Sequence, residues 1–229
     1  MLTRPRVIAH RGASGYEYEN SRAAFRRAVA LDADGVELDV HATRDGALVV
    51  HHDPTLPGMG TIARLCLADV HGARLPNGEA PPVLSEVLDL LGDRDAWVEL
   101  KTLPEEHDGA LLAALDAGPA PGRYAVHSFD HRIVRRLGER APALRRGILL
   151  SAYVVNPDDV MRSAGATVLW QEWTQIDEAL VNQVHDLGGE VIAWTVNETG
   201  DLQRLARMGV DGLCGNYPDR MRIAVAHAV

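Results

Sequence analysis

Short apolar runs alternate with amphipathic segments along almost the whole chain, and this alternation constrains the fold more than any other feature. Eight such runs are found, and several are almost continuously apolar, which is typical of parallel strands buried on both faces. Alternating strands and helices predict a parallel sheet, and eight strand–helix units predict an α/β barrel of the TIM (β/α)₈ type. The expected strands are residues 7–12, 35–40, 96–101, 124–129, 147–153, 167–173, 191–196 and 212–217.

Capping residues predict where the intervening helices begin. Ser, Asp and Asn side chains accept hydrogen bonds from free N–H groups in the first helical turn, and Pro favours the first helical position. Residues of these types precede each amphipathic segment that shows a helical period. The expected caps are Asn20 or Ser21, Ser85, Asp130, Asn156 before Pro157, Asp177 and Thr199.

Two features after the second strand interrupt the alternation. Asp45-Gly46 separates two alternating runs and predicts a β-hairpin, so that the second strand is extended and folds back on itself. Residues 54–82 lack a strong period and are rich in Pro and Gly. We expect them to form a small insertion over the barrel mouth, because so short a segment cannot support a core of its own. Residues 1–229 are therefore predicted to form one barrel domain.

The charge of the chain limits its partners. The formal net charge is -9, from 32 acidic and 23 basic residues, and such a surface repels nucleic acid and anionic membranes. An anionic substrate must then be attracted locally, by placed cations or a metal. No run approaches the roughly 18 apolar residues of a membrane span, and the N-terminus lacks the apolar core of a signal peptide. We expect a cytoplasmic protein that acts on a small molecule and has no stable membrane anchor. The oligomeric state stays open.

Two carboxylates share one face of the second predicted strand. Glu37 and Asp39 are separated by one residue, and alternate residues of a strand point to the same side. Unpaired carboxylates in a barrel core would be very costly, whereas at the carboxyl end of a strand they are suitable ligands for a divalent cation. The alternative is a pair of surface acids on an edge strand, but a closed barrel has no edge.

The third predicted strand repeats this spacing with Glu99 and Lys101. Glu99 would complete the carboxylate set, and Lys101 would point into the same mouth, where it would hold a phosphate oxygen. Lys101 is the only lysine among 23 basic residues. Because lysine and arginine differ in shape and hydration, this choice indicates a site that requires the slimmer ammonium group. The alternatives are chance and a structural Glu–Lys or Lys–Asp pair.

Histidines follow two of the predicted strands. His10, Arg11 and Gly12 end the first strand, where a histidine is a candidate acid or base and an arginine provides a planar fork for phosphate. Taken alone, this trio is equally compatible with an exposed surface turn. The hairpin geometry places His52 near the level of Glu37, beside the carboxylates. His51 and His41 are then expected to be exposed.

Two tryptophans and six histidines have less specific interpretations. Trp170 and Trp194 lie near predicted strand ends, where each is either a core residue, which we favour, or a wall that contacts an alcohol group. No catalytic partner is identified for the remaining histidines, which are His71, His107, His127, His131, His185 and His227.

These motifs together resemble the glycerophosphodiester phosphodiesterase family over almost the whole chain. The order HR, ExD and HD in the first 53 residues is the most specific part of the resemblance. The matching segments are HRG at 10–12, EN and a hydroxyl residue at 19–21, Ala24-Phe25, GVELDV at 35–40, TRDG at 43–46, VVHHD at 49–53, Thr55-Leu56, LSEVLDLL at 84–91, VELK at 98–101, HSF at 127–129, AWTVN at 193–197 and GVDG with NYPD between 209 and 219.

The resemblance implies a metal-dependent phosphodiesterase that releases glycerol 3-phosphate and an alcohol. It implies one divalent cation, calcium or magnesium, held by Glu37, Asp39 and Glu99. His10 and His52 would form the acid–base pair, and we assign His52 as the base and His10 as the acid. Arg11 and Lys101 would bind phosphate, and Trp194 would form a wall for the glycerol. The attacking oxygen is that of water or of the glycerol 2-hydroxyl, which would give a cyclic phosphate.

Two other functions are compatible with these residues. The first is a lysophospholipase D-like enzyme acting on a lipid diester, with Leu56, Met59 and Ile62 contributing to an apolar mouth. The second is a catalytically silent barrel that acts as a binding protein. The complete set of His, Glu, Asp and Lys argues against the second.

Overall fold

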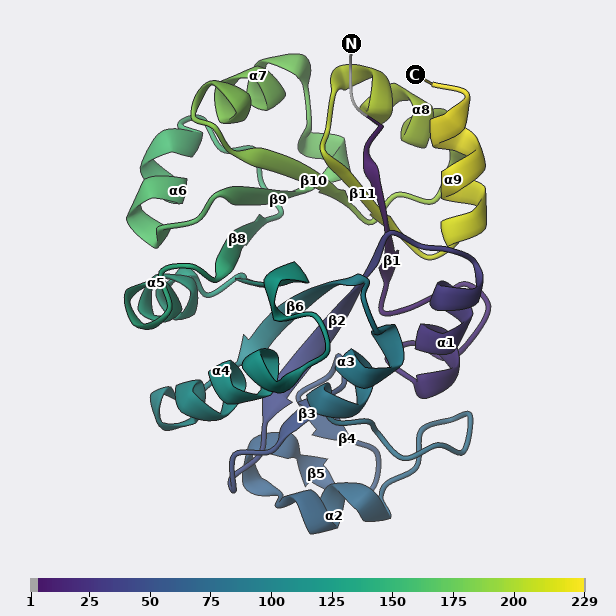
Figure 1. The fold of residues 1–229 in the computed structure, drawn as a ribbon, viewed down its shortest axis with the longest axis vertical. Helices are drawn as coiled ribbons and strands as arrows, with labels where there is room; N and C mark the ends of the chain where they lie inside the picture. Colours follow the sequence, from purple (N-terminus) through teal and green to yellow (C-terminus); the bar gives the residue numbers. More distant parts are fainter. Residues whose placement is uncertain (1–3, 229) are drawn as a thin grey trace.

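The computed structural model describes residues 4–228, and within them eight parallel strands close into a barrel surrounded by helices (Figure 1). The strands follow one another around the barrel in chain order, and β1 pairs with both β2 and β11, which closes the ring. Each predicted strand coincides with one of them, which confirms the TIM barrel. The barrel strands are β1 (Arg6–His10), β2 (Gly35–Ala42), β6 (Asp95–Thr102), β7 (Tyr124–Ser128), β8 (Arg145–Leu150), β9 (Val168–Glu172), β10 (Glu190–Trp194) and β11 (Gly212–Gly215).

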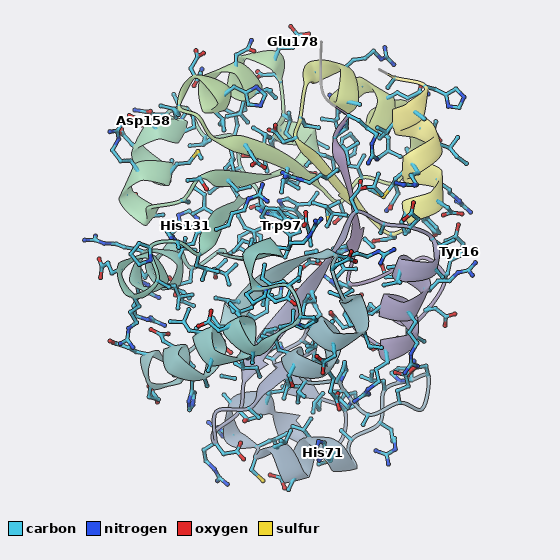
Figure 2. The ribbon with its side chains drawn as sticks, viewed as in Figure 1. Tyr16, His71, Trp97, His131, Asp158 and Glu178 are labelled. Carbon is cyan, nitrogen blue, oxygen red and sulfur yellow. The ribbon has the colours of Figure 1, made fainter. Side chains whose placement is uncertain are left out.

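The inside of the barrel is filled by large apolar side chains in its middle. Trp97 and Trp170 pack there edge to face, with ring centroids 5.3 Å apart, and Figure 2 shows Trp97 near the centre of the molecule. Ile8, Ile192 and Cys214 complete this layer from three further strands. The side chains of the other strand face meet the helices in two larger apolar clusters. The preference for Trp170 as a core residue is therefore confirmed, since its side chain is buried.

The helices form the outer layer of the barrel (Figure 1). Ser21, Asp130 and Asp177 cap their helices as predicted, each accepting a hydrogen bond from a backbone N–H in the first turn. Their bounds are α1 (Arg22–Ala30), α3 (Leu84–Leu91), α4 (Asp108–Ala117), α5 (His131–Arg140), α6 (Pro157–Ala164), α7 (Glu178–Asp186), α8 (Thr199–Met208) and α9 (Pro218–Ala226). Short 3₁₀ turns are η2 (Glu105–His107), η3 (Pro121–Arg123) and η4 (Trp173–Gln175).

Two predicted caps are wrong. Ser85 lies inside α3, which begins after Val83 because Glu86 reaches back to accept a hydrogen bond from the Val83 N–H. The carboxylate thus replaces the expected hydroxyl cap. Thr199 is the first residue of α8, and Glu198 occupies the cap position. Both errors shift the start of a helix by one or two residues, and neither changes the order of elements.

The predicted hairpin and the insertion follow β2. β3 (Leu48–Val50) pairs antiparallel with the carboxyl-terminal part of β2, and the chain reverses at Asp45-Gly46 as expected. The insertion contains β4 (Thr55–Leu56), β5 (Gly60–Thr61), η1 (Ile62–Arg64) and α2 (Leu67–Gly72), which lie beyond β3 in Figure 1. Leu56 and Ile62 are buried in a small apolar cluster with Val49 of β3. The expectation that these two residues contribute to an apolar mouth is wrong, because they anchor the insertion to the hairpin, whereas Met59 is exposed.

Charged side chains close the amino-terminal end of the barrel. Glu190 forms ion pairs with both Arg6 and Arg145, and both guanidinium groups lie against the ring of Trp97. These ion pairs offset the charges of the side chains that close the barrel at its amino-terminal end. The predicted site residues lie at the opposite end of the barrel, at the carboxyl ends of the strands. No helix within residues 4–228 is long and apolar enough to cross a bilayer.

Candidate active site

The strand register brings the predicted site residues together at the carboxyl ends of three adjacent strands. His10 of β1 lies opposite Glu37 of β2, and Asp39 of β2 lies opposite Glu99 of β6. Glu99 in turn lies opposite His127 of β7. The three carboxylates are buried, so they form one cluster beneath the mouth of the barrel.

A bulge aims Lys101 at this cluster. Val40 pairs with Leu100, but the next pair along β2 and β6 is His41 with Thr102, so Lys101 is the extra residue. Bulges of this kind redirect a side chain and are common beside active sites. The Lys101 ammonium lies 2.7 Å from a Glu99 oxygen and 3.1 Å from an Asp39 oxygen.

Asp39 is the most strongly compensated carboxylate of the cluster. Arg11 Nε lies 3.1 Å from its Oδ2, and the Asn20 amide donates a hydrogen bond of 2.7 Å to the same oxygen. Burial would raise the pKa of Asp39, but Arg11 and Lys101, then the hydrogen bond from Asn20, hold it below its ordinary value. Asp39 is therefore an anion in the folded protein. Its Oδ2 is held by Arg11 and Asn20, whereas its buried Oδ1 faces the Lys101 ammonium and has no hydrogen-bond partner among residues 4–228.

The loop after β1 is shaped to place Arg11 over the carboxylates. Arg11 adopts the left-handed backbone region with φ 56°, and its N–H donates to Glu37. A non-glycine residue in this region carries strain and is enriched at functional sites. Gly12 also has a positive φ, of 78°, and a Cβ there would lie 2.6 Å from the backbone carbon of Ala24 in α1. Glycine is thus required for the close approach of loop and helix.

Glu37 and Glu99 are compensated less completely, although Glu37 accepts the Arg11 N–H and Glu99 lies 2.7 Å from the Lys101 ammonium. Burial, and then repulsion by Asp39 and Glu99, raises the pKa of Glu37 well above its ordinary value. Burial, and then repulsion by Asp39, raises the pKa of Glu99 to about 7. Within residues 4–228 the lysine and arginine side chains that form ion pairs with these three carboxylates are Arg11 and Lys101, so the inner cluster keeps an excess of negative charge. A divalent cation would remove this excess and hold the carboxylates ionised.

His127 is a site residue for which the sequence interpretation found no partner. Its imidazole is buried, and its Nδ1 has no hydrogen-bond partner among residues 4–228. One nitrogen of His127 and one oxygen each of Glu37 and Glu99 lie within 4.8 Å of one another. Buried polar atoms without a partner are rare, and this one lies beside two carboxylates whose pKa values are raised. Glu37, Glu99 and His127 therefore fit a divalent cation. In the sequence, His127 was marked by the HSF segment at 127–129, which is one of the segments that carry the family resemblance.

His10 presents one ring nitrogen to the mouth. Its Nδ1–H donates to the Asn216 side-chain oxygen over 2.8 Å, so the unprotonated Nε2 lies on the other side, 3.9 Å from Glu37. Burial, and then the charge of Arg11, lowers the pKa of His10 to about 4. At neutral pH His10 is therefore a neutral imidazole with a free lone pair.

Two of the three histidines of the hairpin, His41 and His51, differ from expectation. Continuing the register of Val40 with Val50 puts His52 at the level of Leu38, one residue from the predicted level of Glu37. The His52 side chain is partly exposed, and its Nδ1 lies 2.9 Å from the Asp53 carboxylate. His41 and His51 were expected to be exposed, and both are buried. For His41 the reason is that η1 of the insertion packs against β2.

An aromatic pair stands at the opposite side of the mouth. Trp194 ends β10 and is half buried, and Phe129 follows β7 with 48% of its surface exposed. The two rings meet edge to face with centroids 5.6 Å apart. Trp194 is thus placed where a wall for a substrate is possible, and Phe129 extends that wall.

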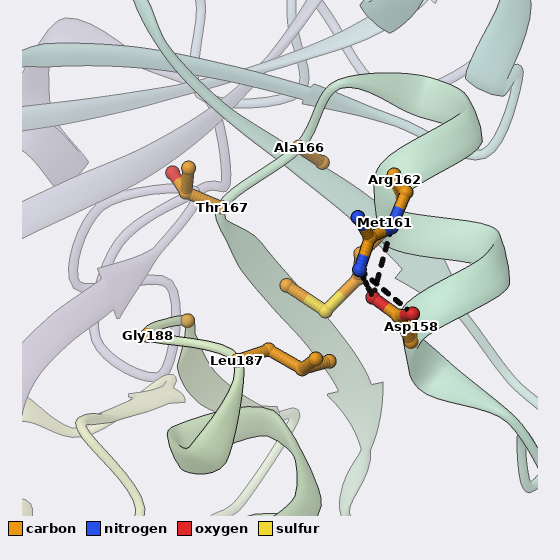
Figure 3. A pocket seen from close by; sticks show the side chains of 8 residues that line it. Asp158, Met161, Arg162, Ala166, Thr167, Leu187 and Gly188 are labelled. Atoms are coloured by element: carbon orange, nitrogen blue, oxygen red, sulfur yellow. Dashed lines mark hydrogen bonds and ion pairs between the residues drawn. The ribbon is translucent and has the colours of Figure 1, made fainter.

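Two cavities help to locate the site. One of about 390 Å³ lies between the segment that follows β6 and the start of α5, and Lys101, Asp130 and Arg136 are among the residues that line it. Another of about 250 Å³ lies beside α6, between the turns that precede β9 and β10, and contains the Asp158–Arg162 ion pair (Figure 3). The second cavity is at the amino-terminal end of the strands, whereas TIM barrels place their chemistry at the carboxyl end.

Comparisons with known proteins identify the family of this chain. Residues 10–220 match the model of the Glycerophosphoryl diester phosphodiesterase family. A glycerophosphodiester phosphodiesterase of Caldanaerobacter subterraneus subsp. tengcongensis is 33% identical over 94% of this chain and 95% of its own length. A putative glycerophosphoryl diester phosphodiesterase of Silicibacter pomeroyi is 28% identical, with a TM-score of 0.88 over 97% of this chain and 93% of that protein.

A further solved structure carries a ligand. A phosphodiesterase of Oleispira antarctica, in complex with its product sn-glycerol-3-phosphate, is 25% identical to this chain. It superposes with a TM-score of 0.90 over 97% of both chains. Fold, site and sequence thus give the same answer over nearly the full length, and this chain belongs to the glycerophosphoryl diester phosphodiesterase family of enzymes.

Proposed function

We propose that this protein uses one divalent cation to hydrolyse glycerophosphodiesters to glycerol 3-phosphate and an alcohol. The observation that carries the metal dependence is the buried carboxylate cluster, because Glu37 and Glu99 have too few cations around them to be ionised together. Glu37, Asp39 and Glu99 are the proposed oxygen ligands, and His127 is a candidate fourth. A ligand set dominated by carboxylates suits Ca²⁺ or Mg²⁺.

The bound cation would polarise the phosphoryl oxygen and make the cluster attractive to an anionic diester. Arg11 and Lys101 flank the carboxylates from two strands and are the proposed phosphate ligands. Arg11 is also held by Glu19 through two hydrogen bonds of 2.8 and 2.9 Å, which fixes the direction of its guanidinium group. We propose that Trp194, together with Phe129, contacts the carbon skeleton of the glycerol.

His10 and His52 are proposed to move the protons, in the reverse order to the assignment from sequence. His10 is neutral with a free Nε2, which suits a base that takes a proton from the attacking oxygen. The His52 side chain is partly exposed, so it can exchange protons with solvent, and its Nδ1 lies 2.9 Å from the Asp53 carboxylate. His52 would then protonate the departing alkoxide.

A panel of diesters tests the proposed function. Glycerophosphocholine, glycerophosphoethanolamine and lysophosphatidylcholine are incubated with the protein, with Ca²⁺, Mg²⁺ or excess chelator. We expect release of glycerol 3-phosphate from the first two, and its loss with the chelator. Turnover that is insensitive to the chelator would contradict the metal dependence. Faster release of choline from the lysolipid would favour the lysophospholipase D-like function, and absence of hydrolysis with every substrate and metal would favour a silent binding protein.

The route of attack is tested in the same reactions. Phosphorus NMR during turnover distinguishes a glycerol cyclic phosphate, formed by the 2-hydroxyl, from direct attack by water. Fractionation of the source cells tests the expected cytoplasmic location.

A further inference from the structure

His41 connects three parts of the site without reaching the carboxylate cluster itself. Its Nε2–H donates to the backbone carbonyl of His52 over 3.0 Å. Its Nδ1 accepts from the Thr102 hydroxyl, also over 3.0 Å. His41 belongs to β2, Thr102 ends β6, and His52 lies on the segment that returns from the hairpin.

The two hydrogen bonds define the tautomer of His41. A carbonyl oxygen can only accept, so Nε2 must carry the proton. Nδ1 then has a lone pair, which the Thr102 hydroxyl satisfies as a donor. Both polar atoms of this buried ring are therefore used, and the ring has one orientation that satisfies both.

Both partners of His41 are adjacent to the proposed machinery. Thr102 is paired with His41 immediately after the bulge that contains Lys101, so their bond closes the bulge. The second bond holds the backbone of His52, which lies two residues beyond the end of β3 at Val50 and next to His51, whose N–H still donates to the Asp39 carbonyl of β2. The His52 side chain is partly exposed, and its Nδ1 contacts the neighbouring Asp53. A fixed backbone is then the main determinant of where its imidazole lies.

We propose that His41 is a positioning residue that holds His52, and secondarily Lys101, in the geometry required for phosphodiester hydrolysis. This proposal rests on the proposed function. Residues that orient a catalytic group in this way typically contribute about 10–100-fold to activity. Because His41 acts through backbone and bulge geometry, its loss should lower kcat and leave KM nearly unchanged.

Replacing His41 by Gln or Asn tests its two hydrogen bonds separately. In His41→Gln the amide nitrogen takes the place of Nε2 and keeps the bond to His52, whereas in His41→Asn the amide oxygen takes the place of Nδ1 and keeps only the bond to Thr102. His41→Leu removes both. We expect kcat to fall about 10–100-fold in His41→Asn and His41→Leu, with rescue to within about threefold in His41→Gln. His71→Asn, an exposed histidine on α2, is the matched control and should behave as the unmodified protein.

Equal kcat in His41→Asn and the unmodified protein would overturn the proposal, and so would a His41→Gln variant as slow as His41→Leu. Calcium binding of each variant is measured by calorimetry, and an unchanged affinity is expected because His41 is not among the proposed ligands. A loss of affinity parallel to the loss of kcat would assign His41 to the metal site instead.

Nitrogen NMR of the ¹⁵N-histidine-labelled protein gives a test that needs no variant to fold. We expect the His41 signals of an Nε2–H tautomer, and an Nδ1–H tautomer would overturn the proposal. If the unmodified protein hydrolyses no diester, the proposed function fails while this spectroscopic result stands. The two failures are therefore distinguishable.

Discussion

The imidazole of His127 lies flat against the indole of Trp170, with ring centroids 4.2 Å apart and planes 3° from parallel. Trp170 is fixed in the barrel core, so the stacking fixes the direction of the His127 ring nitrogens. Burial lowers the pKa of His127 to about 3, so the ring stays neutral and its lone pair is available near Glu37 and Glu99.

Replacing His127 should weaken metal binding. His127→Phe keeps the stacking on Trp170 and removes both nitrogens, and we expect the dissociation constant for Ca²⁺ or Mg²⁺ to rise about tenfold or more. Isothermal calorimetry measures the effect, and His71→Phe serves as the control on an exposed surface. An unchanged dissociation constant would restrict the ligands to the carboxylates.

Metal binding should stabilise the protein more at higher pH. The pKa of Glu99 is about 7 in the metal-free fold, above its value in the unfolded chain, so folding stability is present below about pH 4.3 and is lost as the pH rises towards 7. A bound cation reverses this loss by holding Glu99 ionised. We therefore expect the rise in Tm on adding Ca²⁺ to be larger at pH 8 than at pH 5.5. An equal rise at both values would show that Glu99 does not titrate with the metal.

The two histidines that we propose as base and acid should respond differently to the leaving group. His10→Ala and His52→Ala should each lower kcat about 10²–10⁴-fold with glycerophosphocholine. A diester with a p-nitrophenol leaving group needs no protonation on departure, so it should restore most of the rate of His52→Ala and little of that of His10→Ala. Restoration of His10→Ala instead would support the original assignment of His52 as the base.

The pH dependence of kcat/KM gives a second test of the proposal that His10 is the base. With saturating metal, kcat/KM of the unmodified protein should fall as the pH drops through about 4, where His10 becomes protonated. An acid limb near 6.5 would show that His10 has an ordinary pKa in the working enzyme.

Arginine should not replace Lys101. The ammonium fits between Glu99 and Asp39 at distances of 2.7 and 3.1 Å, in a cluster that also holds Arg11. The larger planar guanidinium would displace one of the carboxylates. We expect Lys101→Arg to lose about as much kcat/KM as Lys101→Met, and near-normal activity of Lys101→Arg would show that only the charge matters. Arg44→Lys, an exposed position, is the control for the reverse exchange.

Glu190 should matter for stability and not for catalysis. Its removal in Glu190→Gln leaves Arg6 and Arg145 facing each other without their shared anion. We expect a loss of about 1–3 kcal/mol, since all three side chains are partly exposed, and a Tm several degrees lower. Glu139→Gln, which breaks a surface pair with Arg135, should cost less than about 0.5 kcal/mol. A reduced kcat in Glu190→Gln at low temperature would contradict this separation of the two barrel ends.

Local patterns in the sequence were sufficient to predict the barrel strands and which face of a regular strand each side chain takes. Alternation fixes which side of a strand a side chain takes, so the shared face of Glu37 and Asp39 followed from spacing alone. Closure of eight units placed this pair and Glu99 at one mouth. The hairpin at Asp45-Gly46 followed from turn chemistry, because few residue pairs adopt that turn.

The tertiary structure decided what spacing does not encode. The bulge at Lys101 depends on pairing between β2 and β6, and the burial of His41 depends on the insertion that packs against β2. The alignment of His127 with Glu99 is a register between two strands, and the sequence of neither strand specifies it. Sequence determined the direction of each side chain from its own strand, because that is a property of local backbone geometry. Only the folded barrel decided which charges meet and which remain uncompensated, because burial and Coulomb interactions depend on neighbours that are distant in the chain.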